Sequence, residues 1–404
     1  MVAIGGVAAT LRRCVGVEPA VFAERYWDRE PLLSKRASDF TDLLSLAGVD
    51  ELLSRRGLRT PFLRVAKQGT IVDPARYTGG GGVGAEIGDQ VLDERLFHLY
   101  SEGATLVLQG LHRLWPALID FAVALRGDLG TPVQVNAYLT PPESQGFAPH
   151  YDTHAVFVLQ VAGRKHWRVH RPVVTDPIER QVWGGRADEV AASAAAEPVI
   201  DTVLEPGDAL YLPRGWVHAA DARAEQSLHL TVGLRAPTRF TLVESLLGLA
   251  ADEPSLRAGL PMGTDPGDRD AIGPALADTV KALHAWLDRL SPDAVAARLR
   301  PDAWLAGRPA PLAPVAQRAA LDALTPDTVI AVRRGLACQF ERPALRLADR
   351  EITFPPVCAA AVERVLAGPP VRIGDLPGLD DDHDRLVLAR RLLVEAVVVA
   401  SASR

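Results

Sequence analysis

Between residues 155 and 234 the sequence alternates short apolar runs with glycine- and proline-containing turns, which strongly limits how this part of the chain can fold. The run 155–161 (AVFVLQV) is rich in β-branched and aromatic residues, and 166–170 resumes a strand after the turn AGRK. A Gly-Asp turn leads into a strand within 205–213, and 227–234 alternates at a period of two, which predicts a half-buried strand. Short strands of this kind predict a double-sheet jelly roll of the cupin type.

Three potential metal ligands lie beside these predicted strands. His150 and Asp152 stand two positions apart in GFAPHYD, and His218 follows in YLPRGWVHAA. On extended backbone, residues i and i+2 point to the same face, so His150 and Asp152 can both face inward while Tyr151 faces away. A His-x-Asp pair followed by a distant His is the spacing of the two-histidine, one-carboxylate triad, which holds Fe(II) and leaves positions open for cosubstrate and dioxygen. A His-x-Asp pair alone is common, and the Pro-Arg-Gly-Trp-x-His context of His218 is what favours a metal site.

The other histidines near these strands receive a different interpretation. His154, His166 and His170 flank the strands, where histidines are usually solvated or hydrogen-bonded. His229 lies on the inward-facing side of its predicted strand, so we expect it beside the ligands rather than among them.

The stretch 136–171 resembles the JmjC-type ribosomal oxygenases, which are Fe(II)- and 2-oxoglutarate-dependent protein hydroxylases. The segment 22–33 (FAERYWDREPLL) resembles their N-terminal entry segment, and PGDALYLPRGWVHAA resembles the strand that carries their distal histidine. The resemblance implies that His150, Asp152 and His218 bind Fe(II). It also implies that 2-oxoglutarate and dioxygen are consumed, with succinate and CO2 as coproducts.

The resemblance also implies residues that hold the cosubstrate. Lys165, fifteen positions beyond His150, matches a basic residue that binds the far carboxylate of 2-oxoglutarate, and Tyr138 matches a tyrosine that helps to hold it. Asn136 and Thr231 match positions that line the pocket. A buried lysine is costly unless it is paired, so a lysine between two apolar strand halves invites an anionic partner. The alternative is a solvated turn lysine. Tyr138, Gln145 and Ser227 are expected to border the target.

The expected reaction is hydroxylation of a side-chain carbon in a ribosomal protein, on a histidine or an arginine. Family members with lysine at the position of Lys165 resemble the histidine-hydroxylating branch, which favours histidine. Thr153 and His154 stand where the family often has an acidic residue. Two alternatives are a related oxygenase acting on another peptide, a small molecule or methyl-lysine, and a non-catalytic, cupin-like regulatory binding protein.

The expected fold class is α+β, with three domains. A double-stranded β-helix (jelly-roll) catalytic domain of the JmjC/cupin type, with a mixed N-terminal segment, is expected over 1–237. After about residue 237 the sequence becomes helical, and the resemblance implies a dimerisation domain over 238–320, hence a homodimer. It also implies a winged-helix-like domain over 321–404. That domain contains several aspartates, so direct DNA binding is not expected and protein docking or a structural role is favoured.

Helical spacing predicts several elements outside the jelly roll. A helix is expected within 40–57, and a helix, a strand and a second helix within 93–127, where Trp115 and Phe121 belong to the core. Further helices are expected over 238–261 and 277–304, separated by a Gly/Asp-rich spacer. In the last domain, strands are expected in VIAVRRG and in ALRLADREITFP, which contains a turn at Ala348-Asp349. A helix over 356–368 and a helix running into a strand over 384–400 follow.

The remaining features favour a cytoplasmic enzyme. A net charge of −6 argues against nonspecific nucleic-acid binding, and three scattered cysteines predict reduced, packed thiols rather than a disulfide framework or zinc cluster. The N-terminus lacks a signal-peptide pattern, and no run approaches the roughly 20 apolar residues of a membrane span. The glycine-rich loop 78–86 lacks the Gly-Lys-Ser/Thr end of a phosphate loop and is expected to border the substrate groove.

Overall fold

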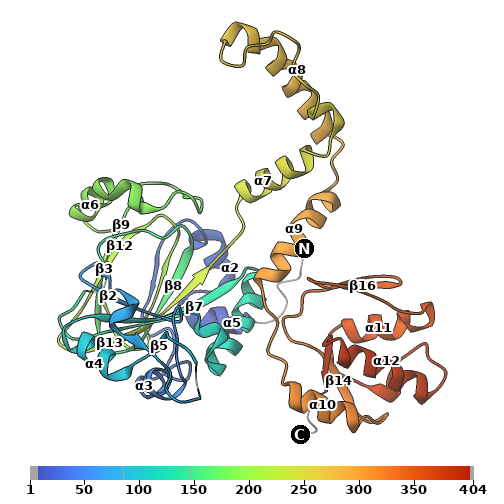
Figure 1. Cartoon of the computed structure of the whole chain (residues 1–404), viewed down its shortest axis with the longest axis horizontal. Helices are drawn as coiled ribbons and strands as arrows, with labels where there is room; N and C mark the ends of the chain where they lie inside the picture. Colours follow the sequence, from blue (N-terminus) through green and yellow to red (C-terminus); the bar gives the residue numbers. More distant parts are fainter. Residues whose placement is uncertain (1–7, 85, 146, 401–404) are drawn as a thin grey trace. The chain divides into compact units, whose positions relative to one another are not determined.

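The computed structural model describes residues 8–84, 86–145 and 147–400, and the chain divides into two compact units, Met1–Ala236 and Pro237–Arg404 (Figure 1). The first unit is dominated by antiparallel sheets with helices packed on them, and the second by helices and small sheets. Within the described ranges, no helix has the length and apolar character needed to cross a membrane.

Eight antiparallel strands form the main sheet of the first unit, and segments far apart in the sequence become neighbours in it. In order across the sheet the strands are β1 (Leu32–Ser34), β11 (Ala209–Leu212), β8 (Ala155–Ala162), β13 (Ser227–Leu234), β7 (Val133–Thr140), β6 (Thr105–Leu108), β2 (Leu63–Lys67) and β3 (Thr70–Ile71). The central strand β13 pairs with β7 on one side and with β8 on the other. The strands predicted in 155–161, 205–213 and 227–234 are confirmed.

A second, three-stranded sheet faces the main one. Its strands, in order, are β10 (Ile200–Leu204), β9 (Lys165–His170) and β12 (Val217–Ala222). Val156 and Val158 of the main sheet share one buried apolar cluster with Trp167 and Val169 of the second sheet, so the two sheets enclose a common interior. A short pair, β4 (Thr78–Gly79) and β5 (Gln90–Val91), holds the two ends of the segment that contains the glycine-rich loop.

The opposite face of the main sheet is covered by helices. These are α1 (Ala9–Cys14), α2 (Pro19–Val21), α3 (Leu46–Arg55), α4 (Asp93–Ser101) and α5 (Pro116–Leu129), while α6 (Ala187–Ala195) lies in the connection between β9 and β10. Phe157 and Leu230 of the sheet share the largest core cluster with Leu52 of α3 and Leu118 of α5. The sheet is therefore buried on both faces, which is why 155–161 reads as a continuous apolar run.

The expectation that 227–234 is half-buried was wrong. Seven of the eight residues of β13 are buried. Leu228, Leu230, Val232 and Leu234 pack on the helix side, and the alternate residues face the second sheet instead of solvent. The alternation along β13 therefore places its apolar residues in the core on the helix side and its other residues in the interior between the two sheets.

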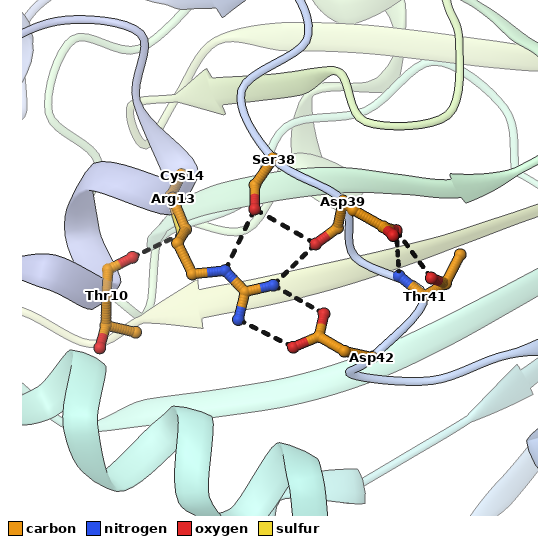
Figure 2. Close-up of polar contacts among 7 residues, drawn as sticks. All are labelled: Thr10, Arg13, Cys14, Ser38, Asp39, Thr41 and Asp42. Atoms are coloured by element: carbon orange, nitrogen blue, oxygen red, sulfur yellow. Dashed lines mark hydrogen bonds and ion pairs between the residues drawn. The ribbon is translucent and has the colours of Figure 1, made fainter.

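Arg13 of α1 forms hydrogen bonds with the loop that follows β1 (Figure 2). The Arg13 guanidinium donates to Ser38 Oγ at 3.2 Å, to the Asp39 carbonyl at 2.7 Å and to both carboxylate oxygens of Asp42 at 2.7 and 3.0 Å. Asp39 in turn accepts from the backbone and hydroxyl of Thr41. Four hydrogen bonds from Arg13 thus hold α1 against the loop that follows β1, the strand at the edge of the main sheet next to β11.

Two predictions about the helices of this unit needed adjustment. The helix expected within 40–57 begins only at Leu46, because Ser45 Oγ accepts the Gly48 amide at 3.1 Å and caps it. The helix–strand–helix over 93–127 is confirmed, and Phe121 is buried. Trp115 is only partly buried, since it is the residue that precedes the first turn of α5.

The second unit contains four consecutive helices, α7 (Arg239–Ala250), α8 (Arg269–Leu287), α9 (Pro292–Ala306) and α10 (Pro314–Asp322). The helix expected over 238–261 ends at Ala250. The helix expected over 277–304 is two helices, because Ser291 caps a new one that starts at Pro292. The first of these starts inside the Gly/Asp-rich spacer, where Asp268 accepts two backbone amides.

The C-terminal part has its own apolar core. Two antiparallel sheets, β18–β14–β19 and β15–β16–β17, pack with two helices; the elements are β14 (Val329–Val332), β15 (Gln339–Glu341), β16 (Ala344–Arg346), β17 (Glu351–Thr353), α11 (Ala359–Leu366), β18 (Val371–Arg372), α12 (Asp382–Val394) and β19 (Val398–Ala400). Helix α10 joins this core through Leu321, and Gln317 donates to the Leu393 and Val398 carbonyls. The strands and helices expected in this region are confirmed.

The three cysteines are at least partly buried, which agrees with the expectation that they are packed. Cys14 is buried, and Cys338 and Cys358 are partly buried within the C-terminal core. Each is a free thiol in the described structure.

Candidate metal centre and adjoining cavity

His150 and His218 are brought together by an isolated antiparallel bridge. The His150 amide donates to the His218 carbonyl at 3.1 Å, and the His218 amide donates to the His150 carbonyl at 2.8 Å. His218 belongs to β12, whereas His150 lies in the connection between β7 and β8, which is extended here without forming a longer strand. The two imidazole rings lie with their centroids 4.4 Å apart.

Each histidine ring is held in one tautomer by a backbone carbonyl two residues earlier. His150 Nδ1 lies 2.8 Å from the Ala148 carbonyl, and His218 Nδ1 lies 3.0 Å from the Trp216 carbonyl. A carbonyl can only accept, so Nδ1 must carry the proton in both rings. Both Nε2 atoms therefore keep a free lone pair, the arrangement that metal-bound histidines adopt.

Asp152 completes the group. One oxygen of its carboxylate lies 3.9 Å from His218 Nε2, and a set of ligand atoms from His150, Asp152 and His218 lies within 4.8 Å of one another. Two nitrogen donors and one carboxylate on one side of a small volume fit the facial triad of non-haem iron. In the described part of the chain, no other group of three or more His, Cys, Asp or Glu side chains has this convergence.

The local electrostatics suit a divalent cation. Burial lowers the pKa of His218 to about 4, with a further contribution from His150 that outweighs the attraction of Asp152. Burial alone would raise the pKa of Asp152, but the combined effect of His218, His150, His154 and Arg235 outweighs burial, and the pKa falls below its ordinary value. At neutral pH His218 is thus neutral and Asp152 ionised, which are the protonation states that ligands need.

The chain on either side of the ligands is fixed by packing. Tyr151 points away from the triad, as expected from the alternation, and is buried with Val190 and Val217; its hydroxyl donates to the Gln181 carbonyl. Gly215 has φ +86° and supplies the bend before His218. A Cβ at this position would lie 2.6 Å from the Val174 carbonyl, so only glycine fits.

Lys165 is the first residue of β9 and is buried, with 4% of its surface exposed. This burial excludes the alternative interpretation, in which Lys165 is a solvated lysine in a turn. Its Nζ donates to Thr140 Oγ1 at 3.0 Å, and no carboxylate of the described residues forms an ion pair with it. Burial lowers its pKa to about 7, against a weaker opposing effect of Asp221. A buried ammonium without a counterion is a suitable partner for the carboxylate of a ligand.

Tyr138, Asn136 and Thr231 lie on neighbouring strands that face the second sheet. Tyr138 pairs with His229 across β7 and β13, and the two rings stack with centroids 4.9 Å apart and an interplanar angle of 7°. Asn136 pairs with Thr231 in the same way, and its Oδ1 accepts from the Gly110 amide at 3.0 Å. Burial raises the pKa of Tyr138 to about 12, so its hydroxyl remains a donor at neutral pH.

A cavity of about 470 Å³ opens beside the triad. Its lining includes Asp152, Asn136, Tyr138 and Thr231, and Lys165 lies outside the lining. The cavity is also lined by residues that were not predicted to be functional, namely Pro61, Phe62, Arg64, Gln109, Gly110, His112, Arg113, Gln134, His154, Gly233 and Arg235. None of the described residues in the glycine-rich loop 78–86 is among them.

The other expected site residues are distributed as follows. His229 is buried and stacks on Tyr138, and burial lowers its pKa well below the ordinary value. His154 was expected to be an ordinary strand-edge residue, but it lines the cavity with its Nε2 3.3 Å from Gln134 Nε2. Ser227 is buried and accepts from Gln160 Nε2 at 2.9 Å, and Gln145 bonds to the Phe147 carbonyl. Neither of the last two lines the cavity.

An aromatic side chain from the connection between β9 and β10 also approaches the ligands. The ring of Trp183 lies 6.2 Å from that of His150, and the ring of Phe147 lies 6.0 Å from it. Nothing in the sequence marked Trp183, because the connection that carries it folds back over the site only through contacts distant in sequence.

Comparison with known proteins shows what this chain is similar to. Residues 119–242 match the family model described as JmjC domain. Ribosomal oxygenase 1 of Rattus norvegicus is 35% identical over 295 residues, covering 69% of this chain and 48% of that protein, and the Homo sapiens protein of the same name is 36% identical, covering 69% and 44%. The chain thus spans less than half the length of these relatives.

Another relative has a compound name, and a solved structure is similar in fold. A Drosophila persimilis protein named bifunctional lysine-specific demethylase and histidyl-hydroxylase NO66 is 31% identical over 252 residues, covering 60% of this chain and 35% of that protein. The structure of YcfD, a ribosomal oxygenase from Escherichia coli in complex with cobalt and 2-oxoglutarate, matches with a TM-score of 0.55 and 18% identity, covering 96% of this chain and 99% of that one. This structural likeness concerns the fold. The resemblance to JmjC-type ribosomal oxygenases is confirmed.

Proposed function

We propose that this chain, which carries a JmjC domain and is a relative of the ribosomal oxygenases, is an Fe(II)- and 2-oxoglutarate-dependent oxygenase that hydroxylates a protein side chain. The observation that carries the proposal is the convergence of His150, Asp152 and His218, with both histidines fixed so that Nε2 is free. The buried, unpaired ammonium of Lys165 supports a dianionic cosubstrate. A binding protein without catalysis has no evident use for either feature.

The residues around the site have distinct tasks. His150, Asp152 and His218 would hold Fe(II), which supplies the oxygen-activating chemistry when 2-oxoglutarate and dioxygen are present. Lys165 would bind the far carboxylate of 2-oxoglutarate, with Tyr138 donating a hydrogen bond. The two facing sheets, which we take to be a double-stranded β-helix, enclose this polar interior, and a buried apolar cluster lies between the same sheets.

We propose histidine in a ribosomal protein as the target. Arg64, Arg113 and Arg235 line the cavity, and Asp152 is the one carboxylate in its lining. A cationic wall disfavours a positively charged arginine or methylated lysine and accepts a neutral imidazole. This argument favours hydroxylation of histidine over demethylation, even though one relative's name includes both activities.

The proposal is tested by mass spectrometry of ribosomal proteins from the source organism. They are incubated with the full chain, Fe(II), 2-oxoglutarate and air, beside a His150→Ala control. We expect one added oxygen on a single histidine in the wild-type reaction and none in the control. Added oxygen on an arginine would refute the choice of target, and loss of a methyl group without added oxygen would replace hydroxylation by demethylation.

We also propose that residues 238–320 mediate homodimerisation and that 321–404 are a winged-helix-like domain. Large apolar residues on the first helices of this region are exposed, including Leu242, Val243 and Leu247 on α7 and Leu276 and Val280 on α8. Exposed apolar stripes of this kind are usually covered by a partner. The test is light scattering at micromolar concentration, where the mass of two chains is expected.

A matched pair of variants makes this test specific. Leu247→Glu should convert the dimer to a monomer, because a charge would be buried in the interface. Val394→Glu makes the same change from apolar to acidic on α12, outside residues 238–320, at a residue that is 62% exposed, and should leave the mass of two chains. A wild-type chain with the mass of one subunit would refute the dimer.

A further inference from the structure

The register of the main sheet places an arginine in line with the aromatic pair beside the metal centre. Arg64 of β2 pairs with Val107 of β6, Val107 pairs with Tyr138 of β7, and Tyr138 pairs with His229 of β13. Directly paired residues point to the same face of a sheet. The Arg64 side chain therefore projects to the face that carries the site, two strands from Tyr138, and both residues line the cavity.

Arg64 is held in this position without a counterion. It forms no ion pair with any carboxylate of the described residues, and its Nε atom is buried without a hydrogen-bond partner. A buried guanidinium nitrogen that lacks an acceptor costs free energy unless a ligand supplies one. The other two arginines of the cavity differ, because Arg235 pairs with Glu179 at 2.9 Å and Arg113 is exposed.

The metal and cosubstrate do not require this charge. Fe(II) brings two positive charges and 2-oxoglutarate two negative ones, and the charges of Asp152 and Lys165 cancel each other. The filled site of the proposed function is therefore neutral without Arg64. The remaining positive charge of the cavity is available to the substrate, for which the cavity volume of about 470 Å³ is adequate.

We propose that Arg64 is a specificity-determining residue that binds a carboxylate of the polypeptide substrate, carried by an acidic side chain close to the residue that is hydroxylated. This inference rests on the proposed function and adds to it the chemistry of the sequence around the target. A guanidinium forms two parallel hydrogen bonds with a carboxylate, which fixes both distance and orientation. Arg64 thus orients the peptide so that the neighbouring side chain reaches the metal centre.

The test compares matched peptides within each enzyme. The probes are synthetic peptides with blocked ends and a central histidine, each carrying glutamate at one of the flanking positions, beside its glutamine twin. Addition of oxygen is measured by mass spectrometry with the Fe(II)-loaded full chain, and kcat/KM is compared for the two members of each pair. Because the ratio is taken within one enzyme, partial loss of folded protein does not affect it.

The wild-type chain should prefer the glutamate peptide over its twin by roughly tenfold or more at one or two flanking positions, as expected for a charged hydrogen bond. Arg64→Gln should reduce this ratio to about one, and Arg64→Lys should retain part of it. Arg55→Gln, which removes an exposed arginine outside the cavity lining, should keep the wild-type ratio.

Three results would overturn the proposal: a wild-type chain without preference, a preference that persists in Arg64→Gln, or a variant whose only change is a raised KM for 2-oxoglutarate. The last would assign Arg64 to the cosubstrate. Failure of the proposed function is recognised separately, since the wild-type chain would then form no succinate. In that case the same peptides are labelled with a fluorophore, and their affinities for the Zn(II)-loaded full chain are measured. The ratio of the affinities for the glutamate and glutamine peptides then replaces the ratio of kcat/KM, with the same expected values for each variant.

Discussion

His150 and His218 are joined by two reciprocal backbone hydrogen bonds, and each ring donates its Nδ1 proton to the carbonyl two residues before it. The bridge thus brings the two rings together, and the two carbonyls fix their tautomers. The geometry needed for metal binding is therefore built by the backbone before any ion arrives, and only Asp152 has to be added, two positions after His150. Preorganisation of this kind lowers the cost of binding.

Removal of a triad side chain should abolish tight metal binding. We expect His218→Ala to weaken the affinity for Co(II) by roughly a hundredfold or more. Mutating a residue that only hydrogen-bonds to a metal ligand already lowers metal affinity by about 10–100-fold. His98→Ala is the matched control, since the side chain of His98 is 74% exposed and is not one of the converging ligands. Calorimetric titration of both variants measures the effect, and equal affinities would remove His218 from the metal site.

Lys165 is predicted to bind 2-oxoglutarate without contributing to metal affinity. Lys165→Ala should weaken cosubstrate binding by about 2–5 kcal/mol, roughly thirtyfold or more, as expected when one partner of a buried charge pair is removed. The affinity for Co(II) should stay near that of the wild-type chain. Titration of each ligand in turn separates the two effects, and unchanged cosubstrate dependence would place Lys165 outside the site.

Cosubstrate affinity should fall as the pH rises above about 7. Burial lowers the pKa of Lys165 to about 7 in the free protein, so above this pH the lysine is neutral and must take up a proton when the dianion binds. The affinity should therefore decrease by up to about tenfold per pH unit. His218, with a pKa of about 4, does not titrate in this range.

The pH dependence has its own control. Lys165→Arg keeps the positive charge across the whole range, because arginine does not lose its proton in proteins. Its cosubstrate affinity, even if weaker overall, should be nearly constant between pH 7 and about 9. A wild-type affinity that is constant or increases over the same interval would show that Lys165 does not carry the effect.

The bend before His218 is predicted to require glycine. Gly215→Ala should lower the free energy of unfolding by about 1–3 kcal/mol, because φ is +86° and the new Cβ would meet the Val174 carbonyl at 2.6 Å. Gly127→Ala is the opposite case: it lies inside α5 with nothing within 4 Å of the added Cβ, and should stabilise by about 0.5–1 kcal/mol. Urea unfolding measures both, and equal stabilities would refute the strain argument.

Much of the candidate site could be predicted because its metal ligands lie in short, recognisable sequence motifs. His150 and Asp152 are two positions apart, and the Gly-Trp context marks His218, so the triad needs only one long-range contact to form. Helix starts were predicted less well, although Ser45 and Asp268 are ordinary capping residues whose signal is visible in the sequence.

The cavity could not be predicted, for a different reason. Arg64 acquires its place only through the register of β2 with β6 and of β6 with β7, which no local pattern specifies. His154 has the same origin, since its neighbour in the cavity is Gln134 of β7. The exposure of β13 was misjudged because a polar interior and solvent produce the same alternation of residues along a strand.

The central claim is tested most directly by measuring how fast the full chain converts 2-oxoglutarate to succinate. NMR monitors this Fe(II)-dependent reaction in the presence and absence of a chelator. The wild-type chain should form succinate only with Fe(II), and Asp152→Ala should form none at the same metal concentration. Succinate formation by the chelated chain or by Asp152→Ala at the wild-type rate, or its absence from the Fe(II)-loaded wild-type chain, would contradict the assignment of this site as an oxygenase centre.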